Sequence, residues 1–171
     1  MDVAELLIDG FGRIHESVHR VLDGLSPEDL RHRVDGEANT IAWLVWHLTR
    51  VQDDHVCDAF DVPQVWTSQG WAERFALPFA PSATGYGQHS ADVAAVVVPV
   101  ADLIGYHEEV HARTVGLLGR LQPFDLDRVV DESWDPPVTL GVRLVSVIAD
   151  DLEHVGQAAY VRGIVLRAGE S

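Results

Sequence analysis

An aspartate and a histidine with the spacing of metal ligands lie near the C-terminal end of the chain. Asp150 and His154 are four residues apart, at the edge of the apolar face of a segment with helical periodicity. Residues at this spacing stand one turn apart, with Cβ atoms about 5–6 Å from each other, so a carboxylate and an imidazole can hold one cation. Asp151 lies further inside the apolar face and is the competing carboxylate. The alternative hypothesis is a buried hydrogen-bonded pair, because a charged group in a core must be paired or metal-bound.

Other histidines could add to such a site. His47 lies beside the apolar face of an earlier helical segment, where a single histidine is more often a core residue than a ligand. Residues 107–111 read HEEVH and match the H-E-x-x-H pattern of zinc metalloproteases, in which two imidazoles bind the metal and the glutamate is the general base. His107 and His111 both fall on an apolar face, which predicts that they point into the protein. A second hypothesis gives them a supporting role beside a nearby metal site.

The protease interpretation fits the surroundings poorly. Glu109 places a charge where these proteases usually carry an uncharged residue, and the sequence predicts no strand that could bind a peptide. A metallohydrolase that uses His107, Glu108 and His111 is therefore a remote alternative. The only cysteine, Cys57, lies off the centre of a buried helical face and has no obvious neighbouring cation to activate it.

The elements that must position these residues are helices. Apolar residues recur with a period of 3.6 in four long segments, which we predict as helices over residues 2–25, 39–60, 90–121 and 139–166. Asn39 is the predicted N-cap of the second helix. Residues 61–88 form a long connection rich in glycine, proline and aromatic side chains. Four amphipathic helices with one long crossover predict an all-α four-helix bundle, and 171 residues predict a single domain over the whole chain.

The connection between the second and third helices has two possible roles. It carries Trp66, Trp71 and Phe75, and a segment of this length between helices is often functional. The aromatic side chains would either fold over a site as a lid or cover one end of the bundle, and the sequence does not favour one over the other.

Composition excludes several classes of function. The chain has 12 basic and 27 acidic residues and a formal net charge of −15, which argues against nucleic acid and anionic membranes as partners. No signal peptide or membrane span is predicted, and one cysteine fits a reducing cytosol, so we expect a cytoplasmic protein. All the basic residues are arginines, a bias that indicates a GC-rich genome such as that of an actinobacterium.

Three tracts carry a resemblance to a known family. They are IAWLVWHLTRVQDDH (residues 41–55), VWTSQGWAERF (65–75) and ADDLEHVGQAAYVRG (149–163). Together with the helix order they make the chain resemble the DinB-like superfamily of metal-binding four-helix bundles, which includes the metal-binding domains of mycothiol-dependent maleylpyruvate isomerases. The resemblance covers nearly the whole chain.

The resemblance implies a metal site with one ligand from the second helix and two from the fourth. These positions fall on His47, Asp150 and His154 in this chain. Many members have histidine where Asp150 stands, and the isomerase branch has glutamate, which is one methylene longer. Two histidines and a carboxylate suit zinc or nickel and would also accept iron.

The resemblance also implies a function. A divalent metal would bind mycothiol, a low-molecular-weight thiol, and activate its sulfur toward an electrophilic substrate, as in an S-transferase or isomerase. Arg50 and Arg162 would steady an anionic group of the cofactor or substrate, or else would simply be salt-bridged surface residues. The alternative function is a non-catalytic, stress-related bundle that binds metal or a small molecule. Homodimers are common in the superfamily, although no isolated apolar face in this sequence requires one.

Overall fold

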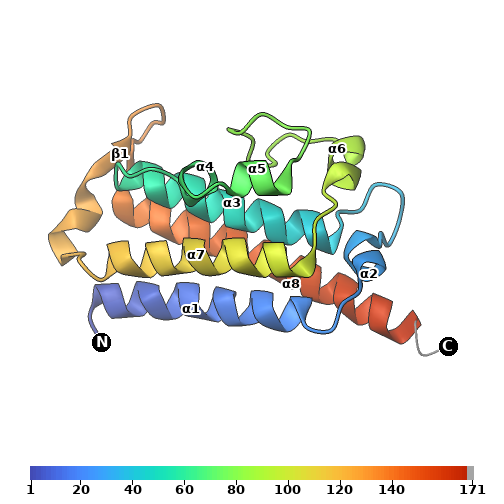
Figure 1. Cartoon of the computed structure of the whole chain (residues 1–171). Helices are drawn as coiled ribbons and strands as arrows, with labels where there is room; N and C mark the ends of the chain where they lie inside the picture. Colours follow the sequence, from blue (N-terminus) through green and yellow to red (C-terminus); the bar gives the residue numbers. More distant parts are fainter. Residues whose placement is uncertain (169–171) are drawn as a thin grey trace.

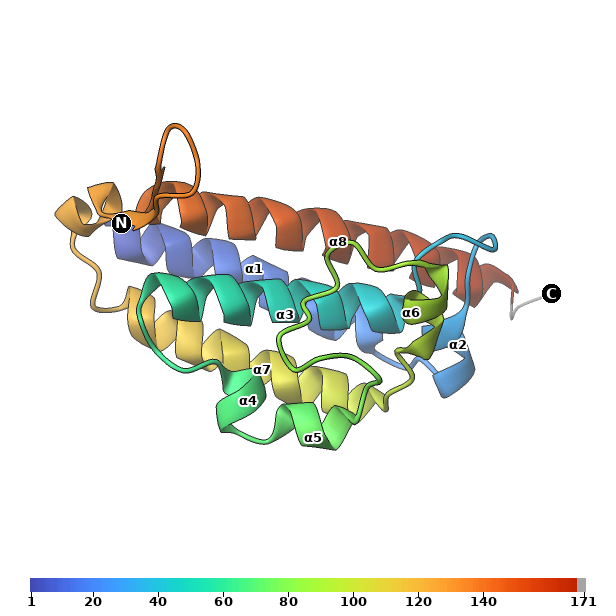
Figure 2. The same ribbon diagram turned by 90° about the horizontal axis from the view of Figure 1, so that it is seen from above.

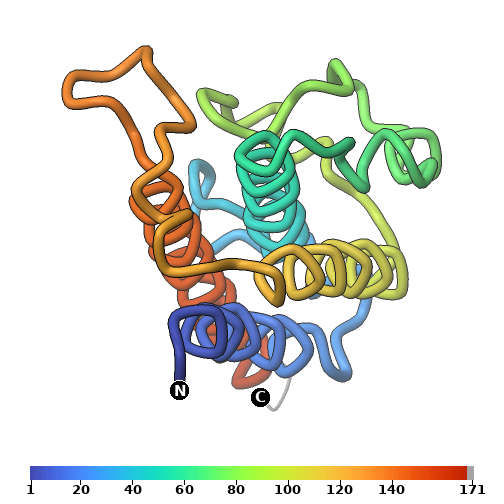
Figure 3. Tube along the Cα trace, turned by 90° about the vertical axis from the view of Figure 1, so that its left-hand side faces the viewer, coloured from blue at the N-terminus to red at the C-terminus, as the bar shows by residue number. Residues whose placement is uncertain are grey.

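Four long helices form a bundle in the computed structural model, which describes residues 1–168. They are α1 (Val3–Leu22), α3 (Ile41–Ala59), α7 (Val100–Leu118) and α8 (Leu140–Ala168). α3 packs along α8 and α7, and α1 packs along α7 and α8, so the four helices surround one core (Figures 1 and 3). The predicted all-α bundle is confirmed.

The remaining elements are short and lie at the ends and on one side of the bundle. α4, α5 and α6 belong to the crossover between α3 and α7, and two short strands pair antiparallel just before α8, with Val129 opposite Thr139. The bounds of these elements are α2 (Pro27–Arg31), α4 (Val65–Ser68), α5 (Trp71–Phe75), α6 (Ser90–Ala95), a 3-10 helix η1 (Pro123–Asp127), β1 (Val129–Asp131) and β2 (Val138–Thr139).

Side-chain caps set the start of three helices. Asp2 and Ser26 each accept a hydrogen bond from a backbone amide three residues later and cap α1 and α2. α3 is capped by Thr40, whose hydroxyl accepts from the amide of Trp43 at 3.1 Å. The predicted cap at Asn39 is therefore wrong by one residue.

The predicted third helix, residues 90–121, is two helices. α6 ends at Ala95, and Pro99 is the N-cap of α7. Proline has no amide hydrogen to donate into a helix and disfavours helical geometry at the residue before it, which is Val98 here. The proline thus explains why one continuous helix does not form.

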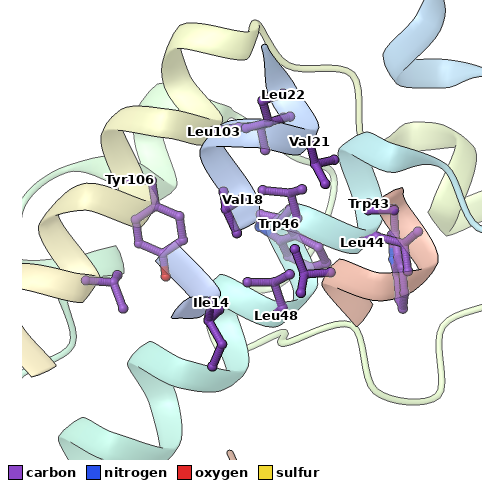
Figure 4. Close-up of a cluster of buried hydrophobic side chains, with 14 of the residues drawn as sticks. Ile14, Val18, Val21, Leu22, Trp43, Leu44, Trp46, Leu48, Leu103 and Tyr106 are labelled. Carbon is purple, nitrogen blue, oxygen red and sulfur yellow. The ribbon is translucent and has the colours of Figure 1, made fainter. Parts of the chain in front are cut away.

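Aromatic and aliphatic side chains from all four helices fill the core. Trp46 and Leu48 of α3, Tyr106 of α7 and Ile14 of α1 are each at most 1 % exposed and lie together in the close-up (Figure 4). Large apolar side chains that leave water in this way supply most of the driving force for folding.

α3 is covered by the crossover as well as by the other helices of the bundle. Every residue from Ile41 to Asp53 is buried. The crossover from α3 to α7 runs across the side of α3 that faces away from α1 (Figure 2). Polar side chains of α3 are therefore enclosed either between helices or beneath this crossover.

None of the helices in residues 1–168 has the length and hydropathy needed to cross a membrane.

Candidate metal centre

The three predicted metal ligands meet between α3 and α8. One ligand atom each from His47, Asp150 and His154 lies within 4.8 Å of the other two. Nε2 of His154 is 3.6 Å from Oδ1 of Asp150, one helical turn away. His47 is buried, and the two residues from α8 are half-buried, so the group faces solvent on one side. No other group of three or more His, Cys, Asp or Glu residues converges in this way within residues 1–168.

Each imidazole of the group is oriented by a neighbouring oxygen. Nδ1 of His47 lies 2.5 Å from the carbonyl oxygen of Thr84, and Nδ1 of His154 lies 3.1 Å from Oε1 of Gln157. Both oxygens can only accept, so in the neutral form of each ring Nδ1 carries the hydrogen and Nε2 keeps its lone pair. Metal-binding histidines are commonly held in this way, with the other ring nitrogen donating to an oxygen.

The neutral state of His47 follows from its surroundings. Burial lowers the pKa of its imidazole, and the hydrogen bond to Thr84 opposes this effect only in part. Because a histidine must be neutral to bind a metal, the site favours the ligand form of the ring.

Trp43 forms one wall beside the two histidines. Its ring stacks on His47 with centroids 4.5 Å apart, and it approaches His154 edge-on at 6.3 Å. Nε1 of Trp43 donates to Oε1 of Gln88 at 2.7 Å, which ties this wall to the crossover.

The crossover passes directly over His47, and a glycine permits this. Gly85 has a φ of +105°, and a Cβ at this position would lie 2.5 Å from Nδ1 of His47 and 3.1 Å from the ring of Trp43. A side chain here would push the loop off the histidine. Thr84 and Gln88 were not predicted as supporting residues, because they lie in a connection without helical periodicity. The role of Gln157 was not predicted either, although it lies in one of the tracts that carry the resemblance.

The carboxylate beside the histidines is Asp150, not Asp151. Asp151 is fully buried, and neither of its carboxylate oxygens has a hydrogen-bond partner. Burial, reinforced by the neighbouring charge of Asp150, raises the pKa of Asp151 well above its usual range. Asp151 therefore points into the core, while Oδ2 of Asp150 is a buried oxygen without a protein partner at the candidate site.

Arg50 is engaged by protein groups. It is fully buried, donates to the carbonyl of Ala83 and the hydroxyl of Tyr106 at 3.1 and 3.2 Å, and lies 3.6 Å from Oδ2 of Asp53. Its guanidinium also lies over the ring of Trp66, 5.2 Å from the centroid. These contacts give Arg50 a structural role, and its predicted role toward an anionic group stays a prediction.

Arg162, near the C-terminal end of α8, also forms hydrogen bonds within the protein. It donates to the carbonyl oxygens of Val21 and Asp23 at 3.0 and 2.7 Å, which joins α8 to the end of α1. The structure brings neither arginine into the group formed by the three candidate ligands, so the anion-binding role of Arg162 also stays a prediction.

The HEEVH histidines lie between α1 and α7. His107 and His111 stack on His15 with centroids 5.5 and 4.2 Å apart, and Nδ1 of His107 lies 3.0 Å from the hydroxyl oxygen of Thr49. Glu108 is half exposed and faces a histidine of α1 at 3.5 Å. Within residues 1–168, no hydrogen bond or ion pair joins His107, Glu108 or His111 to the candidate ligands. The geometry therefore favours neither a metallohydrolase built on these residues nor a supporting role for them at the metal site.

The aromatic part of the crossover covers the bundle. The rings of Trp66, Trp71 and Phe75 surround Tyr106 of α7, with centroid distances of 5.1, 5.8 and 5.8 Å. Asp53 of α3 accepts from the backbone amide of Trp66 at 2.7 Å, which anchors α4. These residues cover the bundle, but on the side formed by α3 and α7 and not at one end as predicted. The part of the crossover next to the site is the segment 84–88.

Comparisons with known proteins agree with this fold. The family model described as Mycothiol-S-transferase matches residues 7–166. A crystal structure of a conserved protein from Enterococcus faecalis is 31 % identical, with a TM-score of 0.90, and the match covers 97 % of this chain and 98 % of that one. A search of curated proteins finds no match. The family model spans nearly the whole chain, so this protein belongs to the mycothiol S-transferase family of DinB-like proteins.

Proposed function

We propose that this protein is a metal-dependent thiol S-transferase that uses mycothiol. The observation that carries the proposal is the convergence of His47, Asp150 and His154, with both imidazoles oriented so that Nε2 is free. Two imidazoles and one carboxylate are a donor set of catalytic zinc sites, which keep a further position open. The half-exposed side of the group leaves room for a small molecule.

The residues present fit a divalent metal. The donors are two imidazole nitrogens and one carboxylate, and Oδ2 of Asp150 is buried without a protein partner. This set suits zinc and nickel and also accepts iron, so the donors alone do not select one metal. A divalent ion bound here would lower the pKa of a coordinated thiol, so that the thiolate is the stable form at neutral pH.

The thiol must come from a separate molecule. Cys57 is buried and donates to Asp53 at 3.3 Å, and burial together with that carboxylate raises the pKa of its thiol to about 12. It is therefore protonated at neutral pH and is not a nucleophile. The family assignment points to mycothiol as the source of sulfur.

The overall transfer is a substitution at carbon. The thiol gives up its proton to solvent, the sulfur electron pair forms a bond to the electrophilic carbon, and the leaving group departs with the electrons of its own bond. The chain orients the reactants: the Trp43 ring and the segment 84–88 enclose His47 from one side and limit the access of water.

A second candidate function is binding without turnover. Its supporting observation is that Arg50 and Arg162, the cations predicted to position an anionic group, are both engaged by protein groups. Binding of mycothiol by metal-loaded protein without consumption of any electrophile would favour this second function.

Metal analysis of purified protein tests the proposal. After loading with zinc and removal of excess metal, wild type should retain one zinc per chain, while His47→Ala and His154→Ala should retain almost none. His111→Ala is the matched control and should retain zinc like wild type. Loss of zinc in His111→Ala with retention in His47→Ala would overturn the assignment in favour of the HEEVH residues.

The second part of the test is turnover. Metal-loaded wild type should accelerate the loss of 1-chloro-2,4-dinitrobenzene in the presence of mycothiol, and His154→Ala should not. Zinc binding without acceleration for a panel of electrophiles would leave the binding function and exclude the transferase.

A further inference from the structure

We propose that an apolar cavity beside the candidate metal centre is a binding site for an uncharged, apolar substituent of the electrophile. The cavity has a volume of about 450 Å³ and lies between α8, the first turns of α3 and the loop that precedes α3. This inference rests on the proposed function, which it deepens by naming the chemical class of the substrate. The residues that form most of its wall are Val34, Ala38, Leu44, Gly156, Tyr160 and Val161.

The cavity begins one helical turn from both histidines of the metal centre. Gln157, which holds Nδ1 of His154 at 3.1 Å, also lines the cavity. Leu44 lies three residues before His47 on α3, and residues three apart are neighbours on a helix surface. A molecule in the cavity therefore lies close enough to place a reactive carbon beside the metal centre.

The lining selects against charge. None of the residues that line the cavity is charged, and the polar side chains besides Tyr160 are the amides of Asn39 and Gln157. An anion would find no cation here and would be repelled by a chain with a net charge of −15. A cation would lose its hydration without gaining a carboxylate. The occupant that fits is uncharged.

The other side of the metal centre is more polar. A smaller cavity of about 130 Å³, bounded by Asp150, is lined by His55, Arg143 and Ser146 together with two valines. The two sides of the centre thus differ in polarity along the groove between α3 and α8. The apolar group of a substrate therefore fits the side of Gly156.

Two side chains at the cavity expose aromatic or aliphatic surface to solvent. Tyr160 is 70 % exposed and Val34 is 44 % exposed. Contact with an aromatic or aliphatic group would remove part of this surface from water, which favours binding by the hydrophobic effect. The volume also falls within the range of small-molecule sites, which is roughly 300–1,000 Å³.

Gly156 allows the cavity to be filled without a clash. A Cβ at this position has no atom within 4 Å, so Gly156→Leu would place its side chain in open space at the cavity wall. Gly12→Leu is the matched control, because Gly12 is also helical and has open space around its Cβ, but lies in α1 away from the cavity.

The first experiment measures binding to zinc-loaded protein by fluorescence. The probes are uncharged N-phenyl-1-naphthylamine and its anionic relative 8-anilinonaphthalene-1-sulfonate. Wild type should bind the uncharged probe at least about tenfold more tightly, Gly156→Leu should lose at least about tenfold in affinity for it, and Gly12→Leu should stay within about twofold of wild type. Unchanged binding in Gly156→Leu, or a preference for the anionic probe, would overturn the proposal.

The second experiment compares kcat/KM for two electrophiles with mycothiol as the thiol. Gly156→Leu should lose at least about tenfold with 1-chloro-2,4-dinitrobenzene and little with iodoacetamide, which is too small to need the cavity. Equal losses with both electrophiles would contradict the proposal. If wild type consumes neither, the transferase function fails, while the fluorescence result still decides whether the cavity binds apolar molecules.

Discussion

His47 donates a hydrogen bond from Nδ1 to the carbonyl oxygen of Thr84, so a residue of the crossover determines which nitrogen of this imidazole faces Asp150 and His154. The carbonyl cannot donate, so the neutral ring must carry its hydrogen on Nδ1 and present Nε2 to the candidate metal. The loop and the metal centre are therefore one unit, and the loop depends on Gly85 for its close approach.

Substitution of Gly85 should weaken metal binding. In Gly85→Ala the new Cβ meets Nδ1 of His47 at 2.5 Å and the backbone φ of +105° is strained for alanine, so the loop must move away from the histidine. We expect a loss of zinc affinity of roughly 10- to 100-fold, as found when groups that orient metal ligands are removed. A competition titration with a chromophoric chelator measures this change.

Gly87→Ala is the control that distinguishes the effect of the contact with His47 from the effect of backbone strain. Gly87 also has a positive φ, of +72°, but no atom lies within 4 Å of the position of its Cβ. Gly87→Ala should therefore keep zinc affinity within about threefold of wild type. Equal losses in the two variants would mean that loop strain, and not the contact with His47, controls the site.

Substitutions of the adjacent residues Asp150 and Asp151 should affect zinc affinity differently. Asp150→Asn removes a charged ligand and should lower zinc affinity by at least about tenfold. Asp151→Asn should keep zinc affinity and raise the free energy of unfolding of metal-free protein at pH 8 by roughly 1–3 kcal/mol, because the buried, unpartnered carboxyl of Asp151 is costly to ionise. Chelator competition and urea unfolding measure the two effects, and loss of zinc in Asp151→Asn alone would identify the other carboxylate as the ligand.

The buried histidines should make metal-free protein less stable in mild acid. Burial first, and then the proximity of His15 and His111, lowers the pKa of His107 well below its usual value of 6.5. The unfolded chain takes up a proton near pH 6.5 that the folded chain does not, so the contribution of His107 is complete above that pH and is lost as the pH falls below it. One such group costs roughly 1.4 kcal/mol for each pH unit below 6.5.

Comparison of wild type with His107→Asn isolates this effect. The asparagine amide can still donate to Thr49 but does not titrate, so urea unfolding of EDTA-treated proteins should show a smaller loss of stability between pH 7.5 and 5.5 in the variant. Asp151, whose raised pKa acts with the opposite sign, is present in both proteins and cancels. Parallel pH profiles would refute the assignment of His107 as a group that stays neutral in the folded state.

Arg50 should contribute mainly to stability. Arg50→Met leaves Asp53 buried without its cation and should lower the free energy of unfolding by about 3 kcal/mol, as for other broken buried ion pairs. Arg13→Met, which breaks an exposed pair with Asp9, is the control and should leave the free energy of unfolding almost unchanged. A stable Arg50→Met protein with a raised KM for mycothiol would instead show that Arg50 binds an anionic group.

Much of the candidate site was predictable from spacing and resemblance. Asp150 and His154 stand one turn apart on a helix whose periodicity is visible in the sequence, and the resemblance added His47 from an antiparallel helix. The choice between Asp150 and Asp151 required the structure, because neighbouring residues on a helix differ by about 100° and the apolar face of α8 extends to both.

Other parts of the candidate site could not be predicted, because they lie in the crossover, a segment whose sequence has no helical periodicity. Thr84 and Gln88 lie in the crossover, whose course over α3 is fixed by tertiary packing and by Gly85. Arg50 lies three residues after His47, close to one helical turn, and this spacing favours the same face of α3. Three residues rotate a side chain by about 60° around the helix, however, and this is enough to direct Arg50 toward Tyr106 of α7.

The proposed metal–thiol contact is tested most directly by cobalt substitution. Wild type loaded with one Co²⁺ per chain should develop a near-ultraviolet thiolate-to-cobalt charge-transfer band when mycothiol is added, and the band should saturate at one thiol per chain. His111→Ala should behave like wild type, and His154→Ala should show no band. Stoichiometric cobalt without a thiolate band in wild type, or a full band in His154→Ala, would contradict the assignment of this centre as the site that activates the thiol.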